Sequence, residues 1–219
     1  MTSIESMQTD LFSDAEAAAA IPGLRYEQDF LTHEEEMHLI EVFKTLPLHA
    51  ARYKQYEARR QVMSFGGTYD FTANKLLPGA PLDARLKPLR DRVAEWMGIS
   101  ASRLVQVLVA YYAPGTPLGW HRDVPDYEAI AGVSFSDEAV LKFRPYPPTD
   151  NAARHNLQLE VAPRSIYLLS GPARWAWQHC VPPVKAPRWS ITFRTPRLAT
   201  KPPVRSSVHV SASPDTTPG

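Results

Sequence analysis

The sequence predicts an α+β fold that is mainly β, a sandwich or jelly roll with N-terminal helices packed on one side. Segments with helical periodicity come first along the chain, and short strands separated by turn residues fill the rest. The proline content supports this order, because the 21 prolines outnumber the 10 glycines and concentrate late in the chain. Proline lacks the N–H that a helix interior needs, which argues against a mostly helical second half.

Two helices are expected. The first begins after Thr32, which forms a capping box with Glu35. The second is expected over 86–97 and ends at Gly98, with Pro88 marking either its first turn or a kink. Apolar stripes at helical spacing predict the buried residues, namely Leu39, Ile40, Phe43 and Leu46 in the first helix and Leu86, Leu89, Val93, Trp96 and Met97 in the second.

The chain after the second helix reads as short strands. Each candidate is rich in β-branched or aromatic residues, and Gly, Pro, Asn or Asp turns separate them. They are expected over 104–112, 139–143, 157–161, 165–169 and 189–194.

Length and composition bound the organisation of the chain. With 219 residues, we expect one domain over 21–198, a flexible arm over 1–20 and a disordered tail over 199–219. The net charge of +1 requires any nucleic-acid face to be local, and the single cysteine excludes a disulfide framework or a Cys-rich zinc site. No apolar run matches a membrane helix or a signal peptide, so a cytoplasmic monomer is expected.

A short motif in the middle of the chain has the residue types of a metal site. On an extended segment, residues two apart share a face, so His121 and Asp123 can converge on one point. An imidazole and a carboxylate supply two of the three ligands of a facial triad for non-haem Fe(II), and His179 is the leading candidate for the third. The alternative is a surface triplet without a metal. Cys180 lies beside His179 but faces the other way on a strand, which favours a buried apolar role.

The last predicted strand carries a second candidate site. Strict alternation places Arg188, Ser190, Thr192 and Arg194 on one face and Trp189, Ile191 and Phe193 on the other. Two guanidiniums facing the interior are costly unless they meet anions, and arginine pairs suit a dicarboxylate. The alternative is an exposed edge strand whose arginines lie in water.

Taken together, these blocks resemble the AlkB family of Fe(II)/2-oxoglutarate dioxygenases. The order is an H-x-D motif, a distant histidine and an R-x-S-x-T-x-R strand. Supporting segments are 112–115, Trp120 beside the iron motif, 169–179, and 59–70, which resembles the entry to the substrate lid. The match runs from about Gly23 to Pro196 and comprises five separated blocks in the family's order.

The resemblance implies a fold, a cofactor and a reaction. The fold would be a double-stranded β-helix holding Fe(II) through His121, Asp123 and His179. Arg188 would bind the distal carboxylate of 2-oxoglutarate, Arg194 the end that chelates iron, and Tyr112 would hydrogen-bond the cosubstrate, with Ser190 and Thr192 on the same face. O2 would convert 2-oxoglutarate to succinate and CO2 while a substrate C–H is hydroxylated, and a hydroxylated N-methyl group would be released as formaldehyde.

Two positions depart from the family pattern. Ala110 stands where the family has an asparagine, so one cosubstrate contact is missing or replaced, with Tyr111 as a candidate replacement. Ser190 also stands where asparagine is common. Neither departure affects the metal ligands.

The substrate residues are expected in the basic, aromatic stretch 52–60 and beyond it. Interleaved basic and aromatic residues suit a nucleic-acid lid, while the alternative is a solvated loop leading into a hairpin with core aromatics such as Phe65 and Phe71. Asp126 and Glu128 either bind the exocyclic edge of a base or are ordinary loop acids. The substrate-binding candidates are Tyr53, Tyr56, Arg59, Arg60, Tyr69 and Asp126.

The two ends of the chain offer further hypotheses. The segment Gln8 to Phe12 resembles the peptide by which bacterial repair proteins dock on a sliding clamp, with Leu11 and Phe12 entering an apolar groove. The alternative is that these two side chains pack on the domain. The basic residues after Arg194 suit either phosphate contacts or a solubilising tail.

The sequence therefore favours an Fe(II)/2-oxoglutarate dioxygenase that removes alkyl groups from DNA or RNA bases, as a DNA-repair enzyme does. Within the class, the alternative is a hydroxylase of a modified tRNA base or a protein side chain. Outside it, the alternatives are a catalytically silent β-helix used as a binding module and a metal-binding cupin without 2-oxoglutarate.

Overall fold

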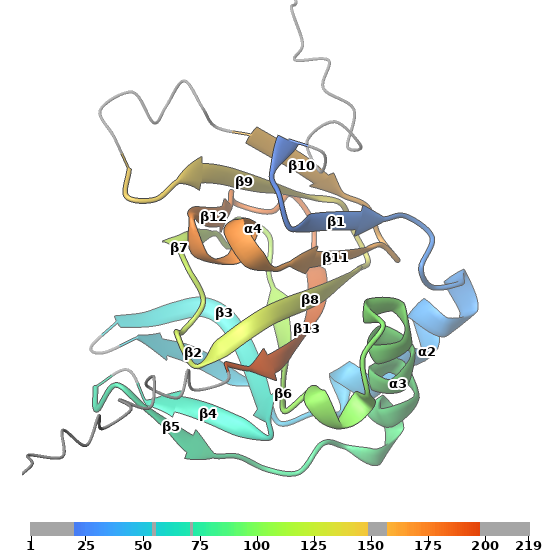
Figure 1. Ribbon diagram of the computed structural model, residues 1–219. Coiled ribbons are helices and arrows are strands. Elements are labelled where there is room, and N and C mark those ends of the chain that lie inside the picture. Colours follow the sequence, from blue (N-terminus) through green and yellow to red (C-terminus); the bar gives the residue numbers. More distant parts are fainter. Residues whose placement is uncertain (1–19, 54–55, 71, 149–156, 198–219) are drawn as a thin grey trace, which may run out of the picture.

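Two antiparallel sheets face each other in the computed structural model, which describes residues 20–53, 56–70, 72–148 and 157–197 (Figure 1). The larger sheet has the strand order β1 (Leu24–Glu27), β11 (Ile166–Leu169), β8 (Tyr127–Phe135), β13 (Arg188–Pro196), β6 (Gln106–Tyr112), β3 (Tyr56–Phe65) and β2 (His49–Tyr53). The smaller sheet has the order β10 (Leu157–Val161), β9 (Ala139–Pro145), β12 (Trp177–Val181) and β7 (Leu118–His121). The predicted jelly roll is confirmed.

The remaining elements flank these sheets. A hairpin of β4 (Gly67–Asp70) and β5 (Lys75–Pro78) leads to η1 (Ala84–Leu86), and η2 (Ala101–Arg103) precedes β6. The helices are α2 (His33–Lys44), α3 (Lys87–Met97) and α4 (Gly171–Trp175). None of the helices among the described residues is long and apolar enough to cross a membrane.

Both predicted long helices form where their capping residues place them. The Thr32 hydroxyl accepts from the Glu35 N–H at 3.2 Å, and the Glu35 carboxylate accepts from the Thr32 N–H at 2.8 Å. Gly98 ends α3 with a φ of 70°, the left-handed conformation that glycine adopts without strain. Pro88 lies in the first turn of α3, so it starts the helix and does not kink it.

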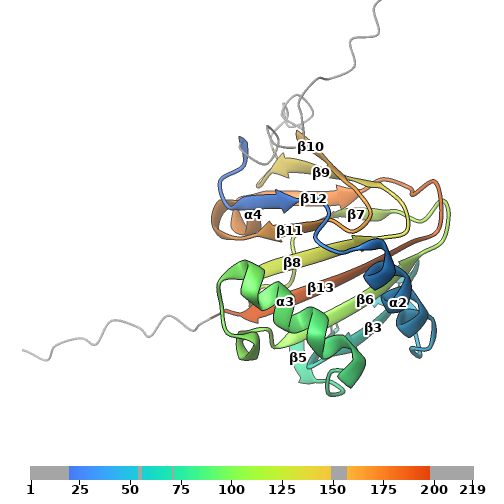
Figure 2. The same cartoon turned by 90° about the vertical axis from the view of Figure 1, so that its right-hand side faces the viewer.

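The two helices cover the outer face of the larger sheet. Figure 2 shows α2 and α3 lying across β13, β6 and β3. Phe43 of α2 packs edge-on against Phe135 of β8 at a ring distance of 5.1 Å, and Val93 of α3 belongs to the same buried cluster as Phe193 of β13. This cluster accounts for the apolar stripes of both helices and holds the sheet rigid behind the site.

All five predicted strands are present, within a few residues of their expected ends, but the prediction missed others. The longest omission is β8, in which six consecutive residues from Ile130 to Phe135 are buried. It lies between β11 and β13 and is covered on both faces, so it has no polar alternation to reveal it. The stretch 52–60 is also not a loop leading into a hairpin, because β2 and β3 pair through it from Arg52 with Glu57 to Tyr53 with Tyr56.

A second buried cluster fills the space between the sheets. It joins Ala110 and Ile130 of the larger sheet to Phe143, Leu159 and Val181 of the smaller one. A cavity with about 530 Å³ of empty space, part of it open to solvent, lies beside this cluster. The polar face of β13 and the metal-type residues both border it.

Candidate active site

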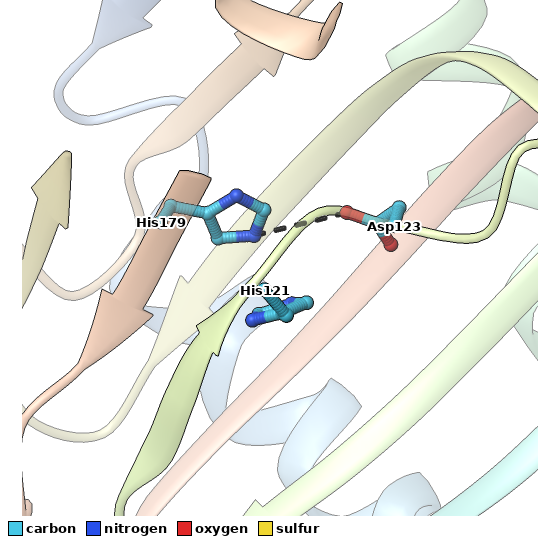
Figure 3. A group of neighbouring side chains, drawn as sticks. All are labelled: His121, Asp123 and His179. Atoms are coloured by element: carbon cyan, nitrogen blue, oxygen red, sulfur yellow. Dashed lines mark ion pairs between the residues drawn. The ribbon is translucent and has the colours of Figure 1, made fainter. Parts of the chain in front are cut away.

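Three metal-type side chains meet between the sheets, from segments far apart in the sequence. His121 ends β7, Asp123 follows it, and His179 lies on β12 directly opposite His121 in the strand register (Figure 3). One ligand atom from each residue lies within 4.8 Å of the others, and the two imidazole rings are 4.3 Å apart. The predicted H-x-D pair and its distant histidine are therefore brought together, and the reading as an isolated surface triplet is wrong.

Hydrogen bonds orient two of these ligands. His121 Nδ1 lies 2.8 Å from the Gly119 carbonyl, so it donates there and leaves Nε2 with a lone pair. Asp123 Oδ1 accepts from the Arg194 guanidinium at 2.8 and 3.1 Å. Asp123 Oδ2 faces His179 Nε2 at 3.7 Å, which leaves one carboxylate oxygen directed at the histidines.

The environment sets these groups in the protonation states that a metal requires. Burial lowers the pKa of His179 to about 3, with further lowering by His121, and burial also lowers the pKa of His121. Burial alone would raise the pKa of Asp123, but Arg194 and the two histidines reverse this, and the pKa lies well below its ordinary value. At neutral pH the site holds two neutral imidazoles and one carboxylate.

These residues fit Fe(II). Two neutral imidazoles and a carboxylate grouped on one side of an accessible cavity form the donor set of the facial triad, which leaves coordination positions open for other ligands. His121, Asp123 and His179 would hold the metal.

The arginine-bearing strand lies in the centre of the larger sheet. β13 pairs with β8 on one side and with β6 on the other, so the alternative of an exposed edge strand is wrong. Ile191 and Phe193 point to the helices and are fully buried, whereas Arg188, Ser190, Thr192 and Arg194 line the cavity.

Arg188 has the surroundings of an anion-binding residue. Its side chain is only 2% exposed, its Nη2 donates to Ser134 Oγ at 3.0 Å, and its Nε has no partner among the described residues. The Thr192 hydroxyl, which lines the same cavity, is also unpartnered within that part of the chain. A buried guanidinium without a carboxylate is costly, so this end of the cavity fits a carboxylate of 2-oxoglutarate.

Arg194 is already engaged in the protein. Its Nε and Nη2 bind Asp123 and its Nη1 donates to Gln106 Oε1 at 2.7 Å. It therefore fixes a metal ligand, and its role toward the iron-chelating end of the cosubstrate stays a prediction.

Tyr112 lines the cavity between two guanidiniums. Burial would raise its pKa, but Arg60 and Arg188 and hydrogen bonds with Arg60 and Ser190 lower it overall. Ala110 also faces this cavity. Tyr111 does not, because it lies on the other face of β6 with its ring 4.7 Å from Trp189, so the expectation that Tyr111 replaces the missing asparagine is wrong.

The structure separates the predicted substrate residues. Arg60 points into the cavity, where its Nη1 donates to Tyr112 Oη at 3.4 Å, while Arg59 is exposed. Tyr69 and Asp126 are half-buried and lie outside the cavity lining. The side chains of Tyr53 and Tyr56, and all of Phe71, lie outside the described residues.

Two other expectations concern residues near the site. Phe65 belongs to the core, and Cys180 is buried, with its pKa raised by burial. The Glu128 carboxylate accepts from Trp175 Nε1 at 2.9 Å, so it fastens α4 to β8. The residues 8–12 and all residues after Arg197 lie outside the described part of the chain.

Sequence reasoning gave no role to Arg174, although it fixes the loop that carries Asp123. Its side chain is 2% exposed and its Nη2 donates to the carbonyls of Asp123 at 3.0 Å and Val124 at 2.7 Å. The sequence feature that could have indicated this role is the position of Arg174, five residues before His179 in the segment 169–179. Tyr167 was also missed, and it enters the cavity because Gly132 opposite leaves room for its ring.

A jelly roll that places a two-histidine, one-carboxylate triad beside a buried arginine defines a class, the non-haem iron oxygenases. The family model of the 2OG-Fe(II) oxygenase superfamily matches residues 6–200, and the chain belongs to this superfamily of 2-oxoglutarate-dependent dioxygenases, which use Fe(II), 2-oxoglutarate and O2.

Individual relatives confirm the resemblance to the AlkB family. The chain is 29% identical over 185 residues to the "Alkylated DNA repair protein ALKBH8 homolog" of Arabidopsis thaliana, covering 74% of this chain and 51% of the relative. It is 23% identical over 170 residues to the mouse (Mus musculus) "tRNA (carboxymethyluridine(34)-5-O)-methyltransferase ALKBH8", covering 75% of this chain and 25% of the relative. The chain thus spans about half the length of the plant protein and a quarter of the mouse protein.

The fold has a solved counterpart. The structure of OsALKBH1 superposes with a TM-score of 0.62 at 13% identity, covering 80% of this chain and 97% of that chain. This likeness supports the fold.

Proposed function

We propose that this enzyme oxidises alkyl groups on nucleic-acid bases and removes N-methyl groups as formaldehyde. With Fe(II) bound, the family chemistry couples oxidative decarboxylation of 2-oxoglutarate by O2 to hydroxylation of a substrate C–H bond. One oxygen atom enters succinate and the other enters the methyl group, and the hydroxymethyl amine then releases formaldehyde. Arg188 would hold the cosubstrate, while Arg174 and Arg194 hold Asp123 in position.

One observation carries the nucleic-acid assignment, namely a group of arginines next to the triad that bind aromatic rings and neutral acceptors and no carboxylate. Arg122 lies 3.7 Å from the Tyr146 ring centre and donates to the Trp175 carbonyl. Arg144 lies 4.4 Å from the Trp120 ring centre and donates to Gln178. Neither forms an ion pair with any carboxylate that the structure describes.

The helical side of the molecule shows the contrast. There Arg85, Arg90 and Arg92 pair with Asp83, Asp91 and Glu35 at 2.6 Å. Uncompensated guanidiniums with adjacent rings are the groups that bind phosphates and stack on bases, which supports a nucleic-acid substrate.

The test combines products with salt dependence. The holoenzyme, supplied with 2-oxoglutarate and air, is expected to give succinate and formaldehyde in equal amounts from methylated single-stranded DNA or RNA. The double variant Arg122→Gln/Arg144→Gln should raise KM for the oligonucleotide at least tenfold and reduce the salt slope of log KM by about 1 to 2. The charge-matched Arg90→Gln should change neither, and succinate without formaldehyde from every methylated oligonucleotide would refute demethylation.

A second candidate is hydroxylation of a modified tRNA base without release of formaldehyde. The mouse relative, whose name refers to a tRNA carboxymethyluridine, favours this second function. Competition between methylated single-stranded DNA and tRNA, followed by mass analysis of the nucleosides, separates the two functions. The same proposal includes that the enzyme acts as a cytoplasmic monomer. It also includes docking on a sliding clamp through Gln8 to Phe12, which deletion of residues 1–20 tests.

A further inference from the structure

The cavity contains a third guanidinium for which the metal triad and the predicted cosubstrate contacts leave no role. Arg60 reaches it from β3, the strand next to β6. Among the residues that the structure describes, its hydrogen-bond partner is Tyr112, whose Oη accepts from Nη1 at the long distance of 3.4 Å. Its Nε is buried and lacks a partner among the described residues. The side chain is therefore inside the site, and no carboxylate in the described part of the chain forms an ion pair with it.

Arg60 is more exposed to solvent than Arg188, although both guanidiniums lie close to Tyr112. The Tyr112 hydroxyl is influenced by both guanidiniums, but only Arg188 is almost fully buried and bound to Ser134. Arg60 is half-buried. His121, Asp123 and His179 line the same cavity as Arg60, so this guanidinium and the metal ligands border one space. A half-buried guanidinium in this cavity is within reach of a ligand that enters from solvent.

The charges of the cavity leave Arg60 uncompensated. Among the described residues, the cavity is lined by three guanidiniums, on Arg60, Arg188 and Arg194. It is lined by one carboxylate, Asp123, which pairs with Arg194. Fe(II) adds two positive charges and 2-oxoglutarate two negative ones, so the bound cofactors do not remove the excess. A partly buried cation persists at low cost when the ligand it meets is an anion.

We propose that Arg60 is a specificity-determining residue that binds an anionic oxygen group of the oxidised substrate. This inference rests on the proposed function for the identity of the substrate, in which the anion is the phosphate beside the target nucleoside or a carboxylate on its base. The competing role is a cosubstrate contact that replaces the asparagine missing at Ala110.

Binding measurements with the Mn(II)-loaded protein under anaerobic conditions distinguish these roles. Titration calorimetry gives the Kd of 2-oxoglutarate, and then, with 2-oxoglutarate bound, the Kd of inorganic phosphate, acetate, 1-methyladenosine and its 5′-monophosphate. The variants are Arg60→Gln, Arg60→Lys and, as a charge-matched control on the exposed surface, Arg103→Gln. Circular dichroism melting shows whether each variant is folded.

We expect Arg60→Gln to bind 2-oxoglutarate within threefold of the wild type and to lose the anion preference by about tenfold or more. Arg60→Lys should keep part of the preference for anions, and Arg103→Gln should keep all of it. Loss on phosphate and the monophosphate identifies a phosphate site, and loss on acetate alone identifies a carboxylate site. Anion binding without binding of either nucleoside probe would keep the Arg60 site and contradict the nucleic-acid function.

Two results would overturn the proposal. One is that the wild type and Arg60→Gln bind phosphate and acetate with equal affinity, which includes the case in which neither protein binds them measurably. The other is a loss of 2-oxoglutarate binding of tenfold or more in folded Arg60→Gln with the anion probes unchanged, which would assign Arg60 to the cosubstrate.

Discussion

The two faces of β13 differ in what surrounds them. On one face, Ile191 and Phe193 are fully buried against α2, α3 and the neighbouring strands. On the other, Arg188 and Arg194 are nearly as buried, yet they border a cavity in which some buried polar atoms have no partner in the described part of the chain. Because successive side chains of β13 point to opposite faces, neighbouring residues lie in two different environments, the apolar core and the polar cavity.

This difference shows that burial alone does not distinguish a stabilising residue from a functional one. Apolar side chains on the helix face gain free energy from leaving water. The guanidiniums and the Asp123 carboxylate on the cavity face cost free energy to bury, and their mutual pairing offsets only part of that cost. We therefore expect substitutions on the two faces to affect different measurements.

The largest effect is expected for Asp123→Asn on the cavity face. The amide keeps the shape of the side chain but removes the charged ligand oxygen beside His179. Since loss of a residue that merely orients a ligand costs about 10- to 100-fold, loss of the ligand itself should reduce 2-oxoglutarate turnover by more than about 100-fold. Succinate formation and Mn(II) binding, measured by electron paramagnetic resonance, provide the test.

The control for Asp123→Asn is the fold. The melting profile by circular dichroism should keep the cooperative transition of the wild type, because the buried cluster that joins α2 and α3 to the sheet does not include Asp123. Wild-type turnover in a folded variant would show that the triad is not the metal site.

On the helix face, Phe193→Ala should act on stability. Phe193 is fully buried in the cluster beneath the helices, so the truncation should lower the free energy of unfolding by about 3 to 5 kcal/mol. Urea unfolding measures this change, and Ile191→Val, which removes one methylene, should cost about 0.5 to 1.5 kcal/mol. The fraction that stays folded should bind 2-oxoglutarate with unchanged Kd. A large change in that Kd would show that the two faces are coupled.

Features encoded in local periodicity could be predicted from the sequence. The capping box at Thr32, the stop at Gly98 and the alternation from Arg188 to Arg194 each depend on neighbouring residues, and the structure confirms the helices and the two faces of the strand. The residue types and order of the metal triad were also readable. Its closeness depends on the pairing of β7 with β12, for which the motif resemblance was the only guide.

Other features depend on contacts between distant strands. β8 has both faces covered and contains Gly132, so its sequence lacks the alternation of a half-buried strand. Arg60 enters the cavity because Val62 pairs with Ala110, which brings this end of β3 alongside Tyr112. A slip of one residue in that register would have turned Arg60 outward and Arg59 inward.

The last prediction uses pH to distinguish the cavity face of the site from the helix face. Burial holds the pKa of His179 near 3, below the 6.5 of an unfolded histidine, so the unfolded chain binds the extra proton. Its contribution to stability is therefore complete above pH 6.5 and is lost as the pH falls from 6.5 toward 3, and His121 acts in the same direction. With the metal removed by a chelator, the free energy of unfolding should fall by up to about 1.4 kcal/mol per pH unit from His179 over this range, and His121 should add to the fall.

Matched variants assign this slope to the cavity face. His179→Gln should reduce the slope between pH 6.5 and 5, and the part of the slope that remains is the contribution of His121. His38→Gln, at an exposed position on α2 and outside the cavity lining, is the matched control and should leave the slope unchanged. Urea unfolding at several pH values measures all three proteins, and an equal slope in His179→Gln and the wild type would mean that the imidazole of His179 is not held neutral by the fold.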